Sequence, residues 1–292
     1  MTVFIQYLVN GLSMGSVYAI IALGYTMVYG IAKMLNFAHG DVIMVGAYVS
    51  FCATSYLGLP GWASVVLSCV VCTVLGVLIE GLAYKPLRQA PPLSVLITAI
   101  GVSYFLQNLA LILFGSQQKA YPTIVQLGQV TIGSVTIDGV TILTLLVTAL
   151  IMVVLSFFIN RTRMGKAMRA CSEDKGAAQL MGINVNSTIS ATFAIGSALA
   201  AIAGVLLCSF NTSLMPTTGS MPGIKAFTAA VFGGIGSIPG AFLGGLLLGI
   251  IEAMAKAYIS TQLANSIVFA VLIVTLLVRP AGLLGKYVPE KV

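Results

Sequence analysis

The sequence predicts an all-α fold, a polytopic transmembrane helical bundle that forms one membrane domain over residues 1–292. Hydrophobic residues make up 59% of the chain and charged residues only 7%, whereas soluble domains carry about 25% charged residues. The apolar residues form long runs that lack the alternation of a membrane β-strand. A soluble enzyme, a secreted disulfide domain and a disordered regulator are excluded, because so apolar a surface would associate in water.

The number of spans follows from the apolar runs, since a helix needs about 20 apolar residues to cross a bilayer. A shorter piece near 226–238 is interrupted by glycines and is either a short span or a re-entrant segment, because non-helical backbone at membrane depth needs shielding by protein. We therefore expect about eight or nine spans. The eight longer runs are 3–31, 34–57, 61–84, 93–114, 140–160, 187–209, 239–258 and 263–278.

The cations predict which loops are cytoplasmic, because Lys and Arg concentrate on that side. Five of the 14 Lys and Arg residues lie in 161–175, and Lys85 and Arg88 mark 85–92 as a second cytoplasmic loop. Lys33 suggests that the first span ends inside and that the N-terminus lies outside. The net charge of +7 is thus explained by topology, and we do not expect a nucleic-acid partner.

The C-terminal side adds a constraint of parity. Its last cations place the C-terminus on the cytoplasmic side. The 161–175 loop is expected on the same side, so an even number of membrane crossings must separate the two. The runs supply three, so 226–238 must supply a fourth, together with the break at Pro239. The C-terminal cations are Arg279, Lys286 and Lys291.

Residues 115–139 predict a small extracytoplasmic hairpin. Within them, 125–137 alternates β-branched residues with polar ones between glycines, which is typical of two short paired strands.

The cytoplasmic loop 161–186 predicts two short helices. We expect Ser172 to cap the second, with Glu173 and Asp174 in its first turn, where the helix dipole favours acids. The helix would end at Gly182. It could lie on the membrane surface, dock into a soluble partner or be a plain solvated loop. Its small apolar face would consist of Ala177, Ala178, Leu180 and Met181.

Ionisable residues inside spans are costly and often functional. For His39 and Asp41, which follow Lys33 and so should lie near the cytoplasmic membrane surface, we favour capping of the helix that begins near residue 40 over a proton relay or a substrate contact. Glu252 and Lys256 have the spacing of an intrahelical ion pair. Glu80 could reach toward Lys85 or Arg88.

Glycine stripes predict close helix packing. One stripe is Gly236, Gly240 and Gly244, with Gly245 and Gly249 beside it, and another is Gly196, Ala200 and Gly204. The run 233–240 also breaks a helix, and broken helices commonly line a transport pathway, so both interpretations stay open.

The chain lacks the residues for several kinds of chemistry. No GxxxxGK[ST] phosphate-binding loop is present, so an ATP-driven pump would need another subunit. Cys69 and Cys72 have the CxxC spacing of a zinc or redox site, but the sequence contains no second ligand pair. We expect no metal, no cofactor and no catalytic residues.

Three stretches, 35–48, 169–184 and 232–241, resemble the permease subunit of branched-chain amino-acid ABC importers, and the shorter LivH-type subunit more closely than its LivM-type partner. The resemblance covers nearly the whole chain. It implies a multi-pass protein of the bacterial inner membrane that moves hydrophobic amino acids inward by alternating access. It also implies four kinds of neighbour: a second homologous permease, two cytoplasmic ATPase subunits, a periplasmic amino-acid-binding protein and membrane lipid.

The same resemblance implies roles for particular residues. The 161–186 loop would contain the helix that couples to the ATPase, through Arg169, Glu173, Asp174, Ala177, Ala178 and Gly182. The substrate path would include Asn36, His39, Asp41, Gly233, Gly234, Gly236 and Pro239.

Other functions remain as alternatives. A secondary transporter of small amino acids or amides, independent of ATP, would need a buried coupling-ion site, and mid-span carboxylates are few. A passive channel would need a selectivity filter, and no part of the sequence repeats as one. A membrane enzyme would need more than His39 and Asp41.

Overall fold

A computed structural model describes residues 2–122, 124, 128–132 and 135–285. Its elements, in chain order, are α1 (Thr2–Ala32), α2 (His39–Ser55), α3 (Gly61–Ile79), the π-helix η1 (Glu80–Tyr84), the 3₁₀ turn η2 (Lys85–Leu87), α4 (Pro92–Phe114), β1 (Lys119–Ala120), β2 (Gln129–Ile132), β3 (Val135–Asp138), α5 (Gly139–Arg161), α6 (Arg163–Glu173), α7 (Lys175–Leu180), α8 (Val185–Asn211), β4 (Ser213–Leu214), α9 (Ser220–Gly233), α10 (Ile238–Tyr258) and α11 (Ala264–Val278).

The fold is an all-α polytopic bundle, as the composition predicts. Six helices are long and apolar enough to cross a membrane, and α11 is a shorter apolar helix. The remaining two candidates, α2 with 17 residues and α9 with 14, are also shorter. Each of the eight expected runs contains a helix.

Helix α1 lies at the centre of the bundle. From Val17 to Ala32 it is almost wholly buried, against α10, α8, α9 and α5. In contrast, α3, α4 and α5 turn long apolar side chains outward, including Trp62, Phe105 and Leu150. Outward apolar faces suit a protein whose surroundings are lipid or another membrane subunit.

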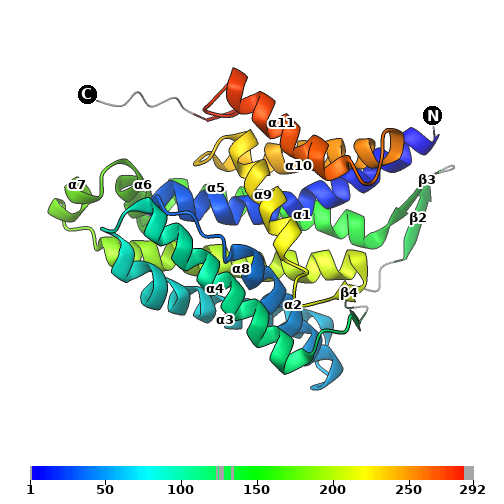
Figure 1. The fold of residues 1–292 in the computed structure, drawn as a ribbon, viewed down its shortest axis with the longest axis horizontal. Helices are drawn as coiled ribbons and strands as arrows, with labels where there is room; N and C mark the ends of the chain where they lie inside the picture. Colours follow the sequence, from blue (N-terminus) through cyan, green and yellow to red (C-terminus); the bar gives the residue numbers. More distant parts are fainter. Residues whose placement is uncertain (1, 123, 125–127, 133–134, 286–292) are drawn as a thin grey trace.

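The bundle has two distinct ends (Figure 1). At the hairpin end, β2 and β3 pair antiparallel, and Gln6 near the start of α1 donates a 2.9 Å hydrogen bond to the carbonyl oxygen of Thr136. Tyr258, at the end of α10, packs edge-on against Tyr7. The α6–α7 loop lies at the opposite end, beside the C-terminus of α1. We call these the hairpin end and the α6–α7 end.

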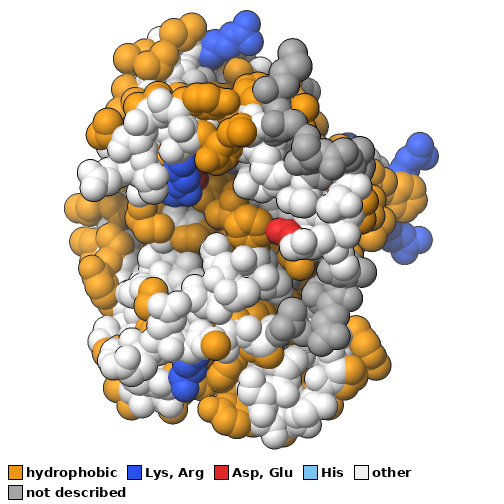
Figure 2. Space-filling view, turned by 90° about the vertical axis from the view of Figure 1, so that its right-hand side faces the viewer, with side chains coloured by type: hydrophobic (Ala, Val, Ile, Leu, Met, Phe, Trp, Pro, Cys, Tyr) orange, Lys and Arg blue, Asp and Glu red, His pale blue; other side chains and the backbone are white. Residues whose placement is uncertain are grey.

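The hairpin expected within 115–139 is formed by β2 and β3, while residues 125–127 and 133–134 lie outside the described part. The strand β1, earlier in the same segment, pairs instead with β4, which follows α8. Figure 2 looks onto the hairpin end, where charged side chains are scattered among apolar and uncharged ones.

Small residues allow the closest helix contacts. A Cβ on Gly245 or Gly249 would overlap the backbone of α1 at Ala19 or Gly15, whereas one on Gly244 would overlap the backbone of α9. Within α10, Gly244 therefore faces a different helix from Gly245 and Gly249, in agreement with the packing interpretation. Gly236, in contrast, lies in the turn before α10, and an added Cβ there would meet nothing within 4 Å.

The segment 226–238, for which the sequence left open a short span or a re-entrant segment, is not one continuous element. Helix α9 begins earlier, at Ser220, and ends at Gly233, and α10 begins at Ile238. The break is a turn between two helices, because Gly234 and Gly236 have φ angles of 109° and 93°. Ser237 caps α10 by accepting a hydrogen bond from the backbone nitrogen of Gly240, and Pro239 occupies the first turn.

Candidate functional site

The 161–186 loop contains two helices, but they divide at a different residue from the one expected. Asp174, not Ser172, caps α7: its Oδ1 accepts hydrogen bonds from the backbone nitrogens of Gly176 at 2.7 Å and Ala177 at 3.0 Å. Ser172 lies inside α6 and bonds to the carbonyl oxygen of Arg169. Glu173 is the last residue of α6 and so lies outside the first turn of α7.

Gly182 follows α7 with a φ angle of 82°, in the left-handed region that favours glycine. Its backbone nitrogen bonds to the carbonyl oxygen of Gln179, and that of Ile183 bonds to the carbonyl oxygen of Ala178, each at 3.0 Å. This pair of bonds is the Schellman arrangement, which satisfies the last carbonyls of the helix. Gly182 therefore ends α7, as its sequence predicts.

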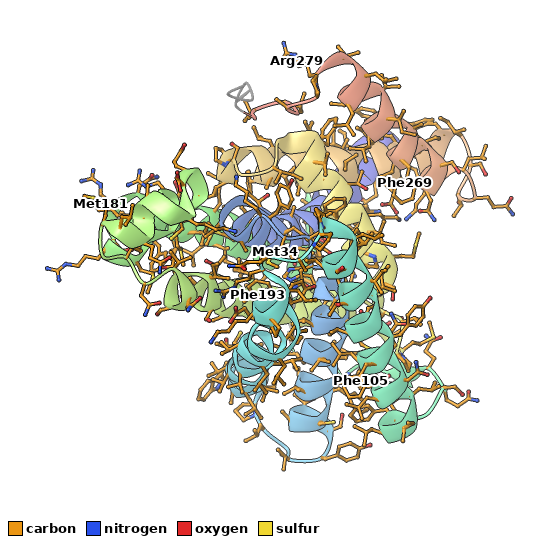
Figure 3. All side chains as sticks on the ribbon, turned by 60° about the vertical axis from the view of Figure 1, so that its left-hand side comes forward. Met34, Phe105, Met181, Phe193, Phe269 and Arg279 are labelled. Carbon is orange, nitrogen blue, oxygen red and sulfur yellow. The ribbon has the colours of Figure 1, made fainter. Side chains whose placement is uncertain are left out.

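The apolar residues of α7 do not share one face. Ala178 is buried against the bundle, while Ala177 is exposed. Leu180 and Met181 are 90% and 83% exposed, and Figure 3 places Met181 at the outer tip of the loop. Large apolar side chains in such a position offer a contact for a partner.

One hydrogen bond joins this loop to the central helix. Lys175, the first residue of α7, donates from Nζ to the carbonyl oxygen of Ala32 at 2.6 Å. Burial, and then the neighbouring positive charges of Arg88 and Lys33, lowers the pKa of Lys175. The ammonium lies against the C-terminal end of α1, where the helix dipole favours a cation.

The chain after α1 turns back into the bundle. Lys33 has a φ angle of 57°, uncommon for a residue other than glycine, and residues 33–38 are not helical. The imidazole of His39 lies against Gly24, where an added Cβ would meet Nε2 at 2.6 Å. Gly24 is eight residues before Ala32, so His39 lies about 12 Å inward from the end of α1. His39 therefore lies deep in the bundle, not at the end of the first span, where its place in the sequence after Lys33 suggested that it would lie.

Neither His39 nor Asp41 caps α2, contrary to the expectation. The N-cap residue is Ala38, and it makes no side-chain cap hydrogen bond. His39 packs on Tyr25 with ring centroids 4.6 Å apart, and its Nε2 has no hydrogen-bond partner among the described residues. A buried polar atom without a partner is uncommon and suggests a functional role.

Asp41 belongs to a polar cluster at the meeting point of three helices. Gln107 of α4 donates from Nε2 to Asp41 Oδ1 at 2.8 Å and to Ser220 Oγ at 3.3 Å. Gly40 packs on the backbone of Gly219 and Gly223. The first turns of α2 and α9 therefore meet inside the bundle, which brings the positive ends of two helix dipoles close together.

Asn36 joins the segment 33–38 to the π-helix η1, since its Oδ1 accepts a 2.9 Å hydrogen bond from the hydroxyl of Tyr84. At the other end of η1, Glu80 pairs with Arg88 and accepts a 2.6 Å bond from Ser190. Of the two cations considered for Glu80, the structure selects Arg88. Asn36, His39 and Asp41 thus lie along one continuous segment.

The glycine run lies elsewhere. Gly233 packs on Gly240, and Gly236 approaches Gly30 near the end of α1. Backbone nitrogens of Leu283 and Leu284 bond to the carbonyl oxygens of Phe232 and Gly233, which fixes the C-terminal segment over this turn. Since Ser220 begins α9 and Gly233 ends it, the run is about 20 Å from the polar cluster. It is at the α6–α7 end, not at the midpoint of a span.

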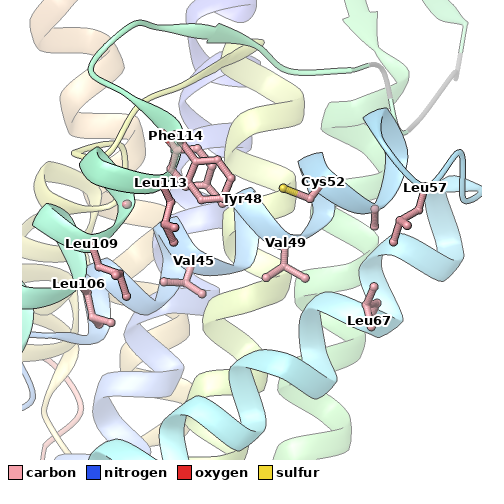
Figure 4. Close-up of a pocket in the computed structure, with 12 residues that line it drawn as sticks. Val45, Tyr48, Val49, Cys52, Leu57, Leu67, Leu106, Leu109, Leu113 and Phe114 are labelled. Atoms are coloured by element: carbon pink, nitrogen blue, oxygen red, sulfur yellow. The ribbon is translucent and has the colours of Figure 1, made fainter.

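An apolar groove lies apart from these polar residues (Figure 4). Its volume is about 310 Å³, and it lies among α2, α3 and α4. Tyr48 and Phe114 stack along it with ring centroids 4.2 Å apart, and the other lining residues are aliphatic apart from Cys52. This groove offers no partner for the charged groups of an amino acid.

Comparison with known proteins identifies the family. Residues 7–277 match the model for the branched-chain amino acid transport system / permease component. The chain belongs to this family.

Two relatives cover almost the entire permease. It is 48% identical over 302 residues to the high-affinity branched-chain amino acid transport system permease protein LivH of Escherichia coli strain K12, with 99% of this chain and 98% of the relative covered. It is also 48% identical, over 301 residues, to BraD of Pseudomonas aeruginosa, which has the same descriptive name. This match again covers 99% of this chain and 98% of the relative.

Among solved structures, PsaBC from Streptococcus pneumoniae in complex with Fab resembles the permease with a TM-score of 0.51. The sequence identity is 15%, and 94% of this chain and 93% of the other are covered. At this identity the likeness concerns the fold alone.

The sequence did not single out Lys225, which is buried in α9. Its Nζ pairs with Glu252 Oε1 at 2.7 Å, and Lys256 pairs with the same oxygen at 2.6 Å. The expected intrahelical pair of Glu252 and Lys256 is therefore half of a larger cluster. The signal that could have found Lys225 is that it interrupts the apolar stretch between 220 and 233.

Proposed function

We propose that this chain is the transmembrane permease subunit of an ABC importer that moves branched-chain amino acids into a bacterial cell. The descriptive names of the two relatives that cover almost the whole chain support this substrate class. In this proposal, ATP is hydrolysed by separate cytoplasmic subunits, and the permease is a transport component that performs no covalent chemistry. The chain would lie in the inner membrane as a multi-pass protein.

The observation that carries the proposal is the shape of the 161–186 loop. Two capped helices extend from the bundle and expose Leu180 and Met181, a surface suited to docking in a partner's groove. The coupling residues would act in distinct ways. Arg169 hydrogen-bonds to Asn160, Asp174 and Gly182 fix the two ends of α7, Ala178 anchors α7 to the bundle, and Glu173 and Ala177 face outward.

The substrate path is proposed to pass Asn36, His39 and Asp41. Support comes from the buried free Nε2 of His39 and from the first turns of α2 and α9 at the same place. Helix N-termini of this kind can face the carboxylate of a substrate, and Asp41 could face its ammonium group. Gly233, Gly234, Gly236 and Pro239 are better explained by packing of the α9–α10 turn.

In the assembled importer, this permease would pair with a second homologous permease, receive substrate from a periplasmic binding protein and contact two ATPase subunits. The outward apolar faces of α3, α4 and α5 are available for the second permease and for lipid. ATP-driven closure of the ATPase pair would move α6–α7, and the bundle would alternate between outward and inward access.

Uptake into vesicles tests this proposal. The complete complex, reconstituted with its binding protein, should accumulate labelled leucine, isoleucine or valine only when ATP is present inside. Leu180→Ser should reduce leucine-stimulated ATP hydrolysis several-fold, because it removes an exposed apolar contact. Gln179→Ser, on the same turn, serves as the matched control. Uptake that needs an ion gradient but no ATP would favour the secondary transporter and overturn the proposal.

A further inference from the structure

A pocket of about 210 Å³ opens at the hairpin end, and we call it the outer pocket. Pockets for drug-sized ligands are about 300–1,000 Å³, so this one suits a smaller molecule. Helices α1, α8 and α10 line it through Tyr7, Asn10, Met14, Phe210, Gly249, Glu252, Ala253 and Lys256.

A charged cluster forms the floor of the outer pocket. Glu252 Oε1 accepts hydrogen bonds from Lys225 at 2.7 Å and Lys256 at 2.6 Å, and Oε2 accepts one from the hydroxyl of Tyr18 at 2.9 Å. Both oxygens of the only carboxylate in the cluster are therefore engaged. With two ammonium groups against one carboxylate, the cluster carries a net charge of +1.

A net positive charge at the wall of a pocket attracts an anionic ligand. The side chain of Lys225 is only 9% exposed, and its ammonium group pairs with Glu252. Lys256 is 41% exposed and lines the pocket, and an ammonium group has three donors, of which Glu252 takes one. The remaining donors of Lys256 are therefore available to a ligand in the outer pocket.

The other walls complete a site for a small amphiphile. Asn10 supplies an amide beside Lys256, while Met14, Phe210 and the ring of Tyr7 form an apolar side. A carboxylate next to an aliphatic group fits this combination, because Lys256 can bind the carboxylate and the apolar side can receive the aliphatic group.

We infer that the outer pocket is an entry site for the amino-acid substrate, in which Lys256 binds the carboxylate of the substrate and the apolar wall receives its side chain. This inference rests on the proposed function and extends it by naming a site at the end opposite to the α6–α7 loop. Glu252 and Lys225 are positioning residues, since Glu252 holds Lys256 in place and Lys225 holds Glu252.

The test is binding of labelled leucine to the purified full complex in detergent, without the binding protein. Wild-type complex should bind leucine saturably, and leucinamide, which lacks the carboxylate, should compete poorly. Lys256→Met should weaken binding about tenfold or more, the usual scale for a charged hydrogen bond. Lys256→Arg should restore most of the affinity. Lys119→Met, which removes another cation at the hairpin end, is the control.

Two results would overturn the inference. One is wild-type leucine affinity in Lys256→Met with an unchanged melting temperature, which would leave the cluster as a structural link between α9 and α10. The other is a wild-type complex that imports leucine with ATP but shows no saturable binding of its own. Failure of the proposed function has a different signature, because the wild-type complex would then not import leucine even with its binding protein.

Discussion

The ammonium group of Lys175 donates a 2.6 Å hydrogen bond to the carbonyl oxygen of Ala32, the last residue of α1. Residue 32 is followed by the left-handed Lys33 and the segment that leads to His39. A movement of α7 would therefore act on the end of the central helix and on the proposed substrate path. The short chain of contacts between loop and path gives a physical basis for coupling.

Lys175→Met should impair coupling more than assembly. The variant loses a charged hydrogen bond to α1, an interaction of about 1.5–3 kcal/mol, while α7 keeps both caps. We expect leucine uptake per ATP hydrolysed to fall several-fold in vesicles containing the full complex. Lys166→Met, on the exposed side of α6, is the control. Equal transport by the two variants would contradict a role for the contact with Ala32.

Asp174→Ala should loosen the start of α7. Loss of an N-cap costs about 1 kcal/mol, so the amides of Gly176 and Ala177 should exchange with solvent about fivefold faster. Hydrogen-exchange mass spectrometry measures this. Asp174→Asn should behave like the wild type, because Asn also caps. Ser172→Ala should leave the exchange unchanged, and a large effect there would return the cap to the position expected from sequence.

Gly249→Ala should destabilise the bundle. A Cβ at this position would overlap the backbone of Gly15 in α1, and overpacking costs about 1–3 kcal/mol. The melting temperature of the purified protein in detergent should fall by several degrees. Gly101→Ala in α4 is the control, since nothing lies within 4 Å of an added Cβ there. A normal melting temperature for Gly249→Ala would show that α1 and α10 can separate without cost.

Asp41→Asn should reduce transport without unfolding the protein. Asn keeps the size and the oxygen that accepts from Gln107, but it removes the charge that is proposed to face the substrate ammonium group. We expect leucine uptake to fall by about tenfold at an unchanged melting temperature. Thr54→Val, which affects only a hydroxyl bonded within α2, should retain uptake. Wild-type uptake by Asp41→Asn would remove Asp41 from the path.

The sequence predicted the end of a helix correctly where that end depends on the backbone conformation of a single residue. Gly182 ends α7 because its φ angle suits glycine, and this holds whatever surrounds the helix. Caps were less certain, because Ser172 and Asp174 are both suitable residues two positions apart. The fold decided in favour of Asp174, since α6 continues through Ser172 to Glu173.

The start of α2 shows the limit of hydropathy. The run 34–57 is mostly apolar, yet its first five residues are not helical. Asn36 bonds to Tyr84, which is 48 residues away in the sequence, and His39 fits against Gly24. These contacts fix the inward course of the chain, and no pattern within the run contains them.

The sequence by itself determined that this protein is a helical membrane bundle, which runs become helices, and that 161–186 is a charged loop. Composition and hydropathy suffice for these, because the cost of exposing or burying a residue depends mainly on its own side chain. Only the tertiary structure decided that Lys225 shares Glu252 with Lys256, that Lys175 binds the end of α1, and that His39 lies deep in the bundle. Each of these depends on partners far away in sequence, and folding alone brings them within hydrogen-bond distance.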